Sequence, residues 1–289
     1  MADVAVIGPG AIGGTVAVRL MEAGRHAVTI CARSPLVRLT VETCHGESTV
    51  VPVILTSPYN GASVDWVCIA TKAHDATGTA GWLRSLVGPA TRVAVLQNGV
   101  EHVARFARYV PETQIVPVIV DMPVERTAPG RFRQRRQGRL IVGCGNNGTS
   151  FTRLFLGTDI EVVTTSDFQT EAWRKLALNC AGAVSALVLK PAAIAWNDTI
   201  ADIMRALIRE CVAVGRAENA AIDDTLVEEV IHRYRSGPAD AINSMHADRV
   251  AGRPMEIDAR NGAVLRFGRK HGIATPVNQM IVALLDAAA

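Results

Sequence analysis

Short apolar runs, separated by longer segments with helical spacing of apolar residues, dominate the first part of the chain. These nearly continuous runs occupy residues 4–7, 27–31, 66–70, 93–96, 115–120 and 160–163. Such runs are typical of strands that are buried on both faces of a parallel sheet, with helices covering each face. The pattern therefore predicts an α/β unit in this part of the chain.

Two segments depart from the regular pattern. Pro117 lacks a backbone N–H, so its run is predicted to be an edge strand or a bulged strand. Residues 131–134 and 140–142 flank a polar turn that contains Gly138, which predicts a short antiparallel hairpin. The arginines of this hairpin fit a solvated sheet edge, where charge discourages pairing with other chains, better than a nucleic-acid surface.

The pattern changes near Ser166. From there to the end of the chain, apolar residues recur at helical spacing, and no repeat or long flexible linker interrupts them. We therefore predict two domains, an α/β domain over residues 1–166 and an all-helical domain over residues 167–289.

A glycine-rich turn follows the first apolar run. Its sequence is Gly8-Pro9-Gly10-Ala11-Ile12-Gly13, and an amphipathic helical pattern then continues as far as Gly24. In a strand–turn–helix of this kind, the first glycine permits the tight turn, the second allows a pyrophosphate to approach the backbone, and the third allows close helix packing. A dinucleotide site formed by Gly8, Gly10, Ala11, Ile12 and Gly13 is predicted. The alternative is a similar turn without a phosphate site.

Arg33 follows the second apolar run, where an NAD-specific site usually carries an acidic residue. No acidic residue lies between Gly24 and Val41. A guanidinium at this point can bind a 2′-phosphate through two parallel hydrogen bonds. Arg33 therefore predicts NADP(H) as the cofactor, and the alternative is a solvated surface charge.

Polar residues follow two further apolar runs. Lys72 comes shortly after the run that ends at Ala70, and Asn98 comes shortly after the run that ends at Leu96. Ligands of open parallel sheets bind beyond the carboxyl ends of the strands, so both residues are candidates for cofactor or substrate contacts. Taken singly, a surface lysine and an ordinary Asn-Gly turn explain them equally well.

The helical part contains three polar insertions in otherwise apolar segments. Lys175 and Asn179 are four residues apart and share a helix face, as do Ser244 and Asp248. Glu256 stands at a predicted helix start, where the helix dipole favours an ionised carboxylate. The alternative for Lys175 is a side chain that extends to solvent, and for Glu256 a residue that only supports the helix start.

Composition excludes several other function classes. The 289 residues are 49% hydrophobic and 4% aromatic and carry a net charge of +3, which favours neither nucleic acid nor an anionic membrane as a partner. The six cysteines form no CxxC pair and fit a reducing cytoplasm. The seven histidines show no metal-binding spacing, so no metal site is predicted.

The ordered motifs GPGAIG, TKAHD, LQNGV, WRKLALN, SMHAD and GRPMEIDARNG resemble those of the ketopantoate reductase (2-dehydropantoate 2-reductase) family, from Ala2 to about Pro276. The resemblance implies an N-terminal Rossmann domain with a doubly wound, mostly parallel sheet, and a helical domain like that at the C-terminus of 6-phosphogluconate dehydrogenase. It implies NADPH-dependent reduction of a 2-oxo acid to a 2-hydroxy acid, above all ketopantoate to pantoate in pantothenate biosynthesis. It also implies a cytoplasmic enzyme that forms a homodimer.

The resemblance also implies roles for individual residues. Lys175 would be the general acid, Glu256 would orient the lysine and the substrate hydroxyl, and Ser244 would hold the substrate carboxylate. Asn98 and Asn179 would contact the substrate. The residues implied as further cofactor contacts are Lys72, Asn98 and Glu256.

This chain departs from the family pattern at two positions on the substrate side. Ala183 and Ala241 stand where the family often has asparagine. A lost hydrogen bond of about 0.5–1.5 kcal/mol would weaken a substrate without abolishing the chemistry, so a bulkier or less hydroxylated 2-oxo acid is the alternative substrate. Two further alternatives are a non-catalytic NADP(H)-binding sensor and a dehydrogenase of the 3-hydroxy acid or 6-phosphogluconate type.

Overall fold

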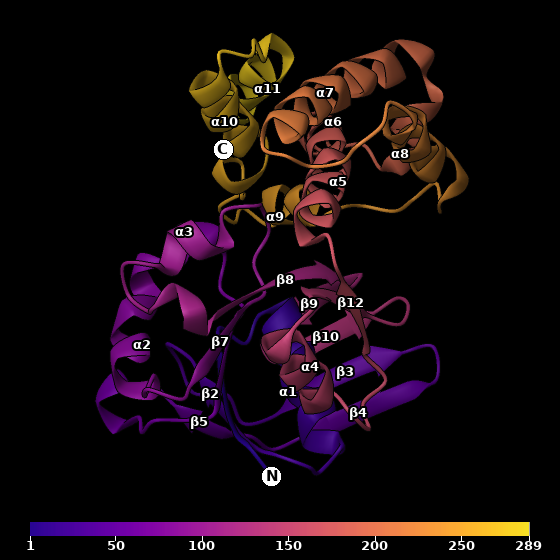
Figure 1. The fold of residues 1–289 in the computed structure, drawn as a ribbon. Helices are drawn as coiled ribbons and strands as arrows, with labels where there is room; N and C mark the ends of the chain where they lie inside the picture. Colours follow the sequence, from indigo (N-terminus) through magenta and orange to yellow (C-terminus); the bar gives the residue numbers. More distant parts are fainter. Residues whose placement is uncertain (289) are drawn as a thin grey trace. The chain divides into compact units, whose positions relative to one another are not determined.

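The computed structural model describes residues 1–288, which form two compact units (Figure 1). The first unit comprises residues 1–97 and 102–168, and the second comprises residues 98–101 and 169–288. The short segment 98–101 thus belongs with the helical part of the chain, although only two residues separate it from the strand Arg92–Val95 of the first unit. No hydrophobic pattern in the sequence predicts that this segment belongs with the helical unit.

The first unit is built on an eight-stranded sheet with the order β12-β11-β8-β7-β6-β1-β2-β5. Its strands are β1 (Asp3–Ile7), β2 (Ala27–Cys31), β5 (Val53–Leu55), β6 (Trp66–Ile69), β7 (Arg92–Val95), β8 (Ile115–Asp121), β11 (Arg139–Gly143) and β12 (Glu161–Thr165). All neighbouring pairs are parallel except β8 with β11. The predicted mostly parallel α/β sheet is confirmed.

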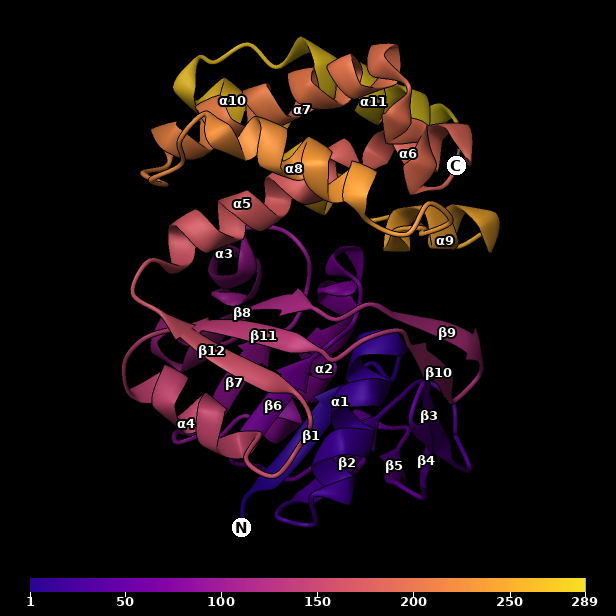
Figure 2. The same ribbon diagram turned by 90° about the vertical axis from the view of Figure 1, so that its right-hand side faces the viewer.

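Helices cover both faces of this sheet (Figure 2). They are α1 (Ala11–Glu22), α2 (Ala80–Leu86), α3 (His102–Phe106) and α4 (Asn146–Leu154). Alternate strand residues face opposite sides, as the two-residue period of a strand requires. Val4 and Val6 join the apolar cluster of α1 and α4, whereas Ala5 and Ile7 join that of α2 and α3. The short 3₁₀ turns of this unit are Pro58–Asn60, Ala73–Asp75, Thr77–Thr79 and Glu112–Gln114.

A second sheet of four strands packs against α1. Its order is β4-β3-β10-β9, and its strands are β3 (Leu39–Thr43), β4 (Gly46–Val50), β9 (Val124–Ala128) and β10 (Arg131–Gln134). Phe132 of β10 lies so close to α1 that a Cβ on Gly14 would come within 2.2 Å of its ring. The close approach of this sheet therefore depends on a glycine in the helix.

The predicted hairpin over residues 131–142 is wrong. Its first strand, β10, lies in the small sheet between β3 and β9, whereas its second strand, β11, lies in the large sheet between β8 and β12. The real hairpin joins β9 to β10 through Gly130, whose φ of +72° suits a tight turn. The polar sequence of β9 hid that strand from hydrophobic-pattern analysis.

The prediction that Pro117 marks an edge or bulged strand is also wrong. Its strand, β8, lies between β7 and β11 without a shift in register. Pro117 is the last residue paired with β7, and the pairing with β11 begins at Val118. The missing N–H therefore falls where one ladder ends and the other begins.

The second unit is helical, and no strand occurs between residues 169 and 288. Its α-helices are α5 (Phe168–Ala181), α6 (Ala183–Val188), α7 (Asp198–Ala217), α8 (Thr225–Ser236), α9 (Ser244–Val250), α10 (Ala263–His271) and α11 (Pro276–Ala287). A 3₁₀ segment (Ala192–Trp196) and a π-helix (Asp258–Gly262) complete it. Trp173 of α5 is fully buried in the core and contacts Gly215 of α7 and the ring of Phe267 of α10. None of the helices in residues 1–288 combines the length and apolar character needed to cross a membrane.

Candidate functional site

The turn after β1 shows why two of its glycines are needed. Gly8 has a φ of +89°, and a Cβ there would lie 2.8 Å from Cγ2 of Thr71, just beyond β6. A Cβ on Gly13 would lie 2.3 Å from the carbonyl oxygen of Gly8 and 2.8 Å from Cβ of Ala70. The ends of β1 and β6 and the start of α1 therefore approach one another as closely as backbone allows. This is the point where the strand order reverses, which is the usual ligand position in such sheets.

Gly10 differs from its two neighbours in the motif. A Cβ there would meet nothing within 4 Å, so no steric contact within the protein requires glycine at this position. Gly10 immediately precedes α1, a 12-residue helix with no acidic residue in its first turn. The unpaired N–H groups at such a helix start, around Ala11 and Ile12, suit an anion. The local geometry therefore fits a pyrophosphate.

Arg33 lies just beyond β2 with its side chain 91% exposed. Its Nη1 is 3.9 Å from Oδ2 of Asp75, an acidic residue of the segment that follows β6. An exposed pair of this length contributes little to stability and leaves the guanidinium accessible to another anion. The acidic neighbour comes from a distant part of the chain, so the acid-free window around Arg33 did not reveal it.

Gln97 forms hydrogen bonds to the segment that contains Lys72. Gln97 is buried two residues after the end of β7. Its Nε2 donates to Oγ1 of Thr71 at 3.0 Å and to the carbonyl oxygen of Lys72 at 3.2 Å. Arg105 donates to Oε1 of Gln97 at 2.9 Å. Sequence analysis assigned no role to Gln97, although this polar residue directly follows the apolar run that ends at Leu96.

His102 holds the same segment from the other side. Its Nε2 lies 2.9 Å from the carbonyl oxygen of Gln97, and its ring is buried beside Phe168. Burial, reinforced by the nearby charge of Arg105, lowers the pKa of His102 to about 4. His102 is therefore neutral near pH 7 and donates its ring N–H to that carbonyl oxygen.

Three predicted residues of the second unit form one hydrogen-bonded chain. Nδ2 of Asn98 donates to Oε2 of Glu256 at 2.9 Å, and Nδ2 of Asn179 donates to Oδ1 of Asn98 at 3.4 Å. Glu256 is buried and stands just before the π-helix that leads into α10. A buried carboxylate that accepts such a bond is fixed in orientation.

Lys175 lies on α5 one helical turn before Asn179. The opposite face of α5 carries fully buried residues such as Trp173, Leu176 and Cys180, whereas Lys175 and Asn179 are half-buried. The core packing of α5 thus aims both polar side chains along one face. The hydrogen-bonded chain lies beside this face, because Asn179 belongs both to the face and to the chain.

Ser244 is held separately, at the first residue of α9. Asn243, which sequence analysis missed, caps this helix by accepting from the backbone N–H groups of Met245 and His246 at 3.0 and 3.1 Å. Its Nδ2 donates to the carbonyl oxygen of Gly182 at 2.9 Å, which links α9 to the segment between α5 and α6. Oγ of Ser244 accepts from Nη2 of Arg260 at 2.6 Å.

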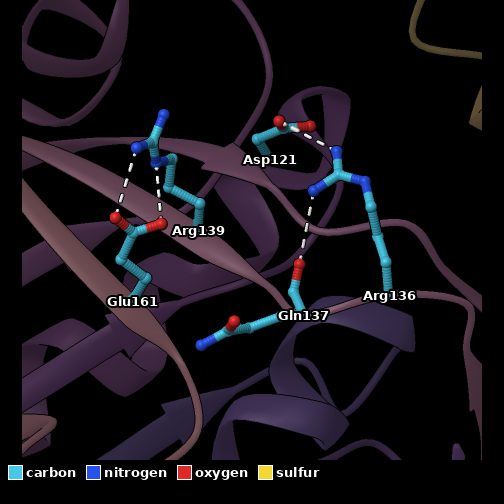
Figure 3. A pocket seen from close by; sticks show the side chains of 5 residues that line it. All are labelled: Asp121, Arg136, Gln137, Arg139 and Glu161. Atoms are coloured by element: carbon cyan, nitrogen blue, oxygen red, sulfur yellow. Dashed lines mark hydrogen bonds and ion pairs between the residues drawn. The ribbon is translucent and has the colours of Figure 1, made fainter.

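A polar pocket of about 240 Å³ lies at one edge of the large sheet, and none of the predicted site residues lines it (Figure 3). It is lined by Asp121, Arg136, Gln137, Arg139 and Glu161. Arg139 and Glu161 stand opposite each other on β11 and β12 and pair at 2.9 Å, and Arg136 pairs with Asp121 at 2.9 Å. These charges neutralise one another, as expected for a protected sheet edge. No group of His, Cys, Asp and Glu side chains within residues 1–288 is arranged to hold a metal ion.

Comparison with known proteins gives matches over both units. The family model described as ketopantoate reductase PanE/ApbA matches residues 4–147, and that described as its C-terminal domain matches residues 167–289. The chain is 55% identical to the 2-dehydropantoate 2-reductase of Caulobacter vibrioides over 289 residues, which covers 100% of each protein.

Solved structures with the same fold extend this result. A 2-dehydropantoate 2-reductase from Geobacter metallireducens matches with a TM-score of 0.93 and 25% identity, covering 99% of this chain and 100% of the other. A dimeric ketopantoate reductase from Staphylococcus aureus matches with a TM-score of 0.89 and 25% identity, covering 99% of this chain and 98% of the other. The predicted architecture of a Rossmann domain followed by a helical domain is therefore confirmed.

Proposed function

Because this chain belongs to the ketopantoate reductase family, we propose that it is an oxidoreductase that reduces 2-dehydropantoate, a 2-oxo acid, to the 2-hydroxy acid pantoate. The observation that carries this proposal is the hydrogen-bonded chain from Glu256 through Asn98 to Asn179, on the helix that also carries Lys175. Carbonyl reduction requires a group that stabilises the negative charge on the oxygen and donates a proton, and the amine of Lys175 can do both.

NADP(H) is the proposed cofactor, and the first unit is its proposed binding domain. The N-terminus of α1 and the open approach over Gly10 support a pyrophosphate site at Gly8, Gly10, Ala11, Ile12 and Gly13. The exposed guanidinium of Arg33 at the end of β2 supports recognition of a 2′-phosphate. Lys72, Asn98 and Glu256 are proposed as further contacts. When bound, the reduced nicotinamide supplies the hydride that the 2-oxo carbon accepts.

The second unit supplies the proton in this proposal. As the carbonyl carbon becomes tetrahedral, negative charge develops on its oxygen, and the Lys175 ammonium stabilises that charge and then donates its proton. Glu256, fixed by Asn98, keeps the amine and the new hydroxyl in line. Asn179 donates a further hydrogen bond at this face, and solvent returns the proton to Lys175 after product release. One hydride and one proton convert the 2-oxo acid to the 2-hydroxy acid.

Of the two positions where the family often has asparagine, Ala183 does not support a larger substrate pocket. Ala183 is fully buried within the core of the second unit, so its small side chain leaves no space for a bulkier substrate. Ala241 stands in the loop before α9, where its carbonyl oxygen accepts from the backbone N–H of Ala192 at 2.8 Å. Ketopantoate is the proposed substrate because the family and the full-length relative favour it, with Ser244 proposed at its carboxylate.

Homodimer formation in the cytoplasm belongs to the same proposal. The dimer is supported by the dimeric state of the Staphylococcus aureus relative. The cytoplasmic location is supported by cysteines such as Cys68, Cys180 and Cys211, which are buried and form no disulfide. Unpaired thiols suit a reducing compartment. Gel filtration with light scattering tests the dimer, and a monomer at micromolar concentration would contradict it.

A substrate panel tests the proposed reaction. Oxidation of NADPH is followed with ketopantoate and with 2-oxo acids that lack the hydroxyl or carry larger side chains, and we expect ketopantoate to give the highest kcat/KM. A higher kcat/KM for a less hydroxylated acid would change the proposed substrate but leave the proposed type of reaction intact. No turnover of any 2-oxo acid with either nicotinamide cofactor would contradict the proposed activity and favour a binding role.

A further inference from the structure

Arg260 is a buried cation beside the serine proposed to hold the substrate carboxylate. It lies in the π-helix Asp258–Gly262, four residues after Glu256, and its side chain is 3% exposed. Nη2 donates to Oγ of Ser244 at 2.6 Å, whereas Nε is buried without a hydrogen-bond partner. Within residues 1–288, this is the one side-chain hydrogen bond of Arg260, and no carboxylate lies within 4.0 Å of it.

The neighbouring side chains of Arg260 form no ion pair with it in the described part of the chain. Tyr234 faces it from α8, and burial raises the pKa of that phenol to about 12, with the arginine charge acting in the opposite direction. The Tyr234 hydroxyl is therefore neutral and donates to the carbonyl oxygen of Leu178 at 3.1 Å. A buried guanidinium without an anion is unfavourable, because burial removes the hydration of its charge. An anion from outside the protein would relieve this.

The bond to Ser244 shows how such an anion would be bound. Because Oγ of Ser244 accepts from the guanidinium, its own hydroxyl proton remains available to donate to a second acceptor. Hydrogen bonds in such a chain polarise one another, so the arginine strengthens the serine as a donor. Ser244 is exposed while Arg260 lies behind it, so an approaching carboxylate meets the serine first.

We propose that Arg260 is a positioning and specificity residue that binds the substrate carboxylate through Ser244 and restricts the enzyme to 2-oxo acids with a free carboxylate. The inference rests on the proposed function, and it names a residue that none of the motif-based roles includes. It also gives a physical reason for the missing asparagine at Ala241, since a buried charge near Ser244 replaces a neutral hydrogen bond on the substrate side.

The test compares a charged and a neutral ligand of the same shape. Steady-state kinetics are measured for ketopantoate and for its uncharged carboxamide, which serves as a competitive inhibitor if it is not reduced. We expect Arg260→Met to raise KM for the acid about 10- to 100-fold while kcat changes less than about threefold. Affinity for the amide should change less than about threefold, and Arg260→Lys should recover part of the preference for the acid.

Two further variants separate this role from a structural one. Arg269→Met removes an exposed arginine of α10 and should leave both ligands unaffected. In a double-mutant cycle, Ser244→Ala and Arg260→Met should be strongly non-additive, because the arginine acts through the serine. If Arg260→Met does not fold, the ratio of acid to amide affinity in Arg260→Lys and Ser244→Ala provides the same readout.

The outcomes distinguish this inference from the proposed function. If the wild-type protein reduces ketopantoate but Arg260→Met weakens acid and amide equally, Arg260 is only structural and the inference is wrong. An unchanged acid-to-amide ratio in Arg260→Lys, or additive effects in the cycle, would also overturn it. A wild-type protein that reduces no 2-oxo acid refutes the proposed function instead.

Discussion

The candidate site of the first unit is formed by backbone groups, whereas that of the second unit is formed by side chains. In the first unit, the site after β1 consists of backbone, and its essential residues are glycines that allow close approach. In the second unit, the site consists of side chains from segments far apart in the chain, since Asn98 is 158 positions from its partner Glu256 and 81 from Asn179. A backbone site depends on steric fit, whereas a side-chain site depends on ionisation and hydrogen bonding. The two should therefore respond to different substitutions.

The largest effect is expected at the amine of the second unit. Lys175→Ala should lower kcat about 10²–10⁴-fold, because it removes the proposed proton donor, while the KM for NADPH changes little. The matched control is Lys190→Ala, an exposed lysine near the end of α6. Steady-state NADPH oxidation measures both. A loss of less than about tenfold in Lys175→Ala would remove the general acid from the mechanism.

A pH titration of stability tests whether the first unit also depends on a buried side chain. The pKa of His102 is about 4 when folded, below the ordinary value of 6.5, so the unfolded chain binds a proton at pH values where the folded chain does not. The contribution of neutral His102 to the free energy of unfolding is complete above pH 6.5. As the pH falls towards 4, that free energy decreases by at most about 3 kcal/mol.

His102→Gln should flatten this pH dependence in urea unfolding, since glutamine keeps a donor for the carbonyl oxygen of Gln97 but does not titrate. A smaller slope should remain, because burial also lowers the pKa of His26 and of His246. Identical slopes in wild type and variant would show that His102 is already protonated or accessible in the folded protein.

Two glycines of the first unit test the steric argument directly. Gly13→Ala should destabilise the protein by about 1–3 kcal/mol, because the new Cβ would lie 2.3 Å from the carbonyl oxygen of Gly8. Gly10→Ala should leave stability unchanged, since nothing lies within 4 Å, yet it should raise KM for NADPH if the pyrophosphate passes over this residue. Unfolding curves and cofactor titrations of both variants give the comparison. Equal loss of stability would contradict it.

Sequence analysis predicted best what depends on local pattern. The run at residues 27–31 coincides with β2, because a strand buried on both faces is apolar throughout. The small sheet was missed, since β4 and β9 are polar, and Pro117 misled because its position in the ladder depends on the register of its neighbours. Local sequence cannot reveal such a register.

The same limit applies to the candidate site. The glycine turn and the four-residue spacing of Lys175 and Asn179 are visible in the sequence because each lies within one element. Gln97 donates to groups 25 and 26 positions away, and Arg260 donates to Ser244, 16 positions away. Their importance follows from burial and from unpaired atoms, which are properties of the folded chain alone.

The smallest expected effect concerns Arg33, the side chain proposed to recognise the 2′-phosphate in the first unit. Arg33→Ala should raise KM for NADPH about tenfold and leave KM for NADH unchanged, because the guanidinium is proposed to bind the 2′-phosphate alone. The effect should shrink at high ionic strength, since the side chain is exposed. Asp75→Ala should act in the opposite direction by removing the competing carboxylate, and the exposed Arg38→Ala is the control. Equal changes for both cofactors would assign Arg33 to general electrostatic attraction, because only NADPH carries the additional phosphate.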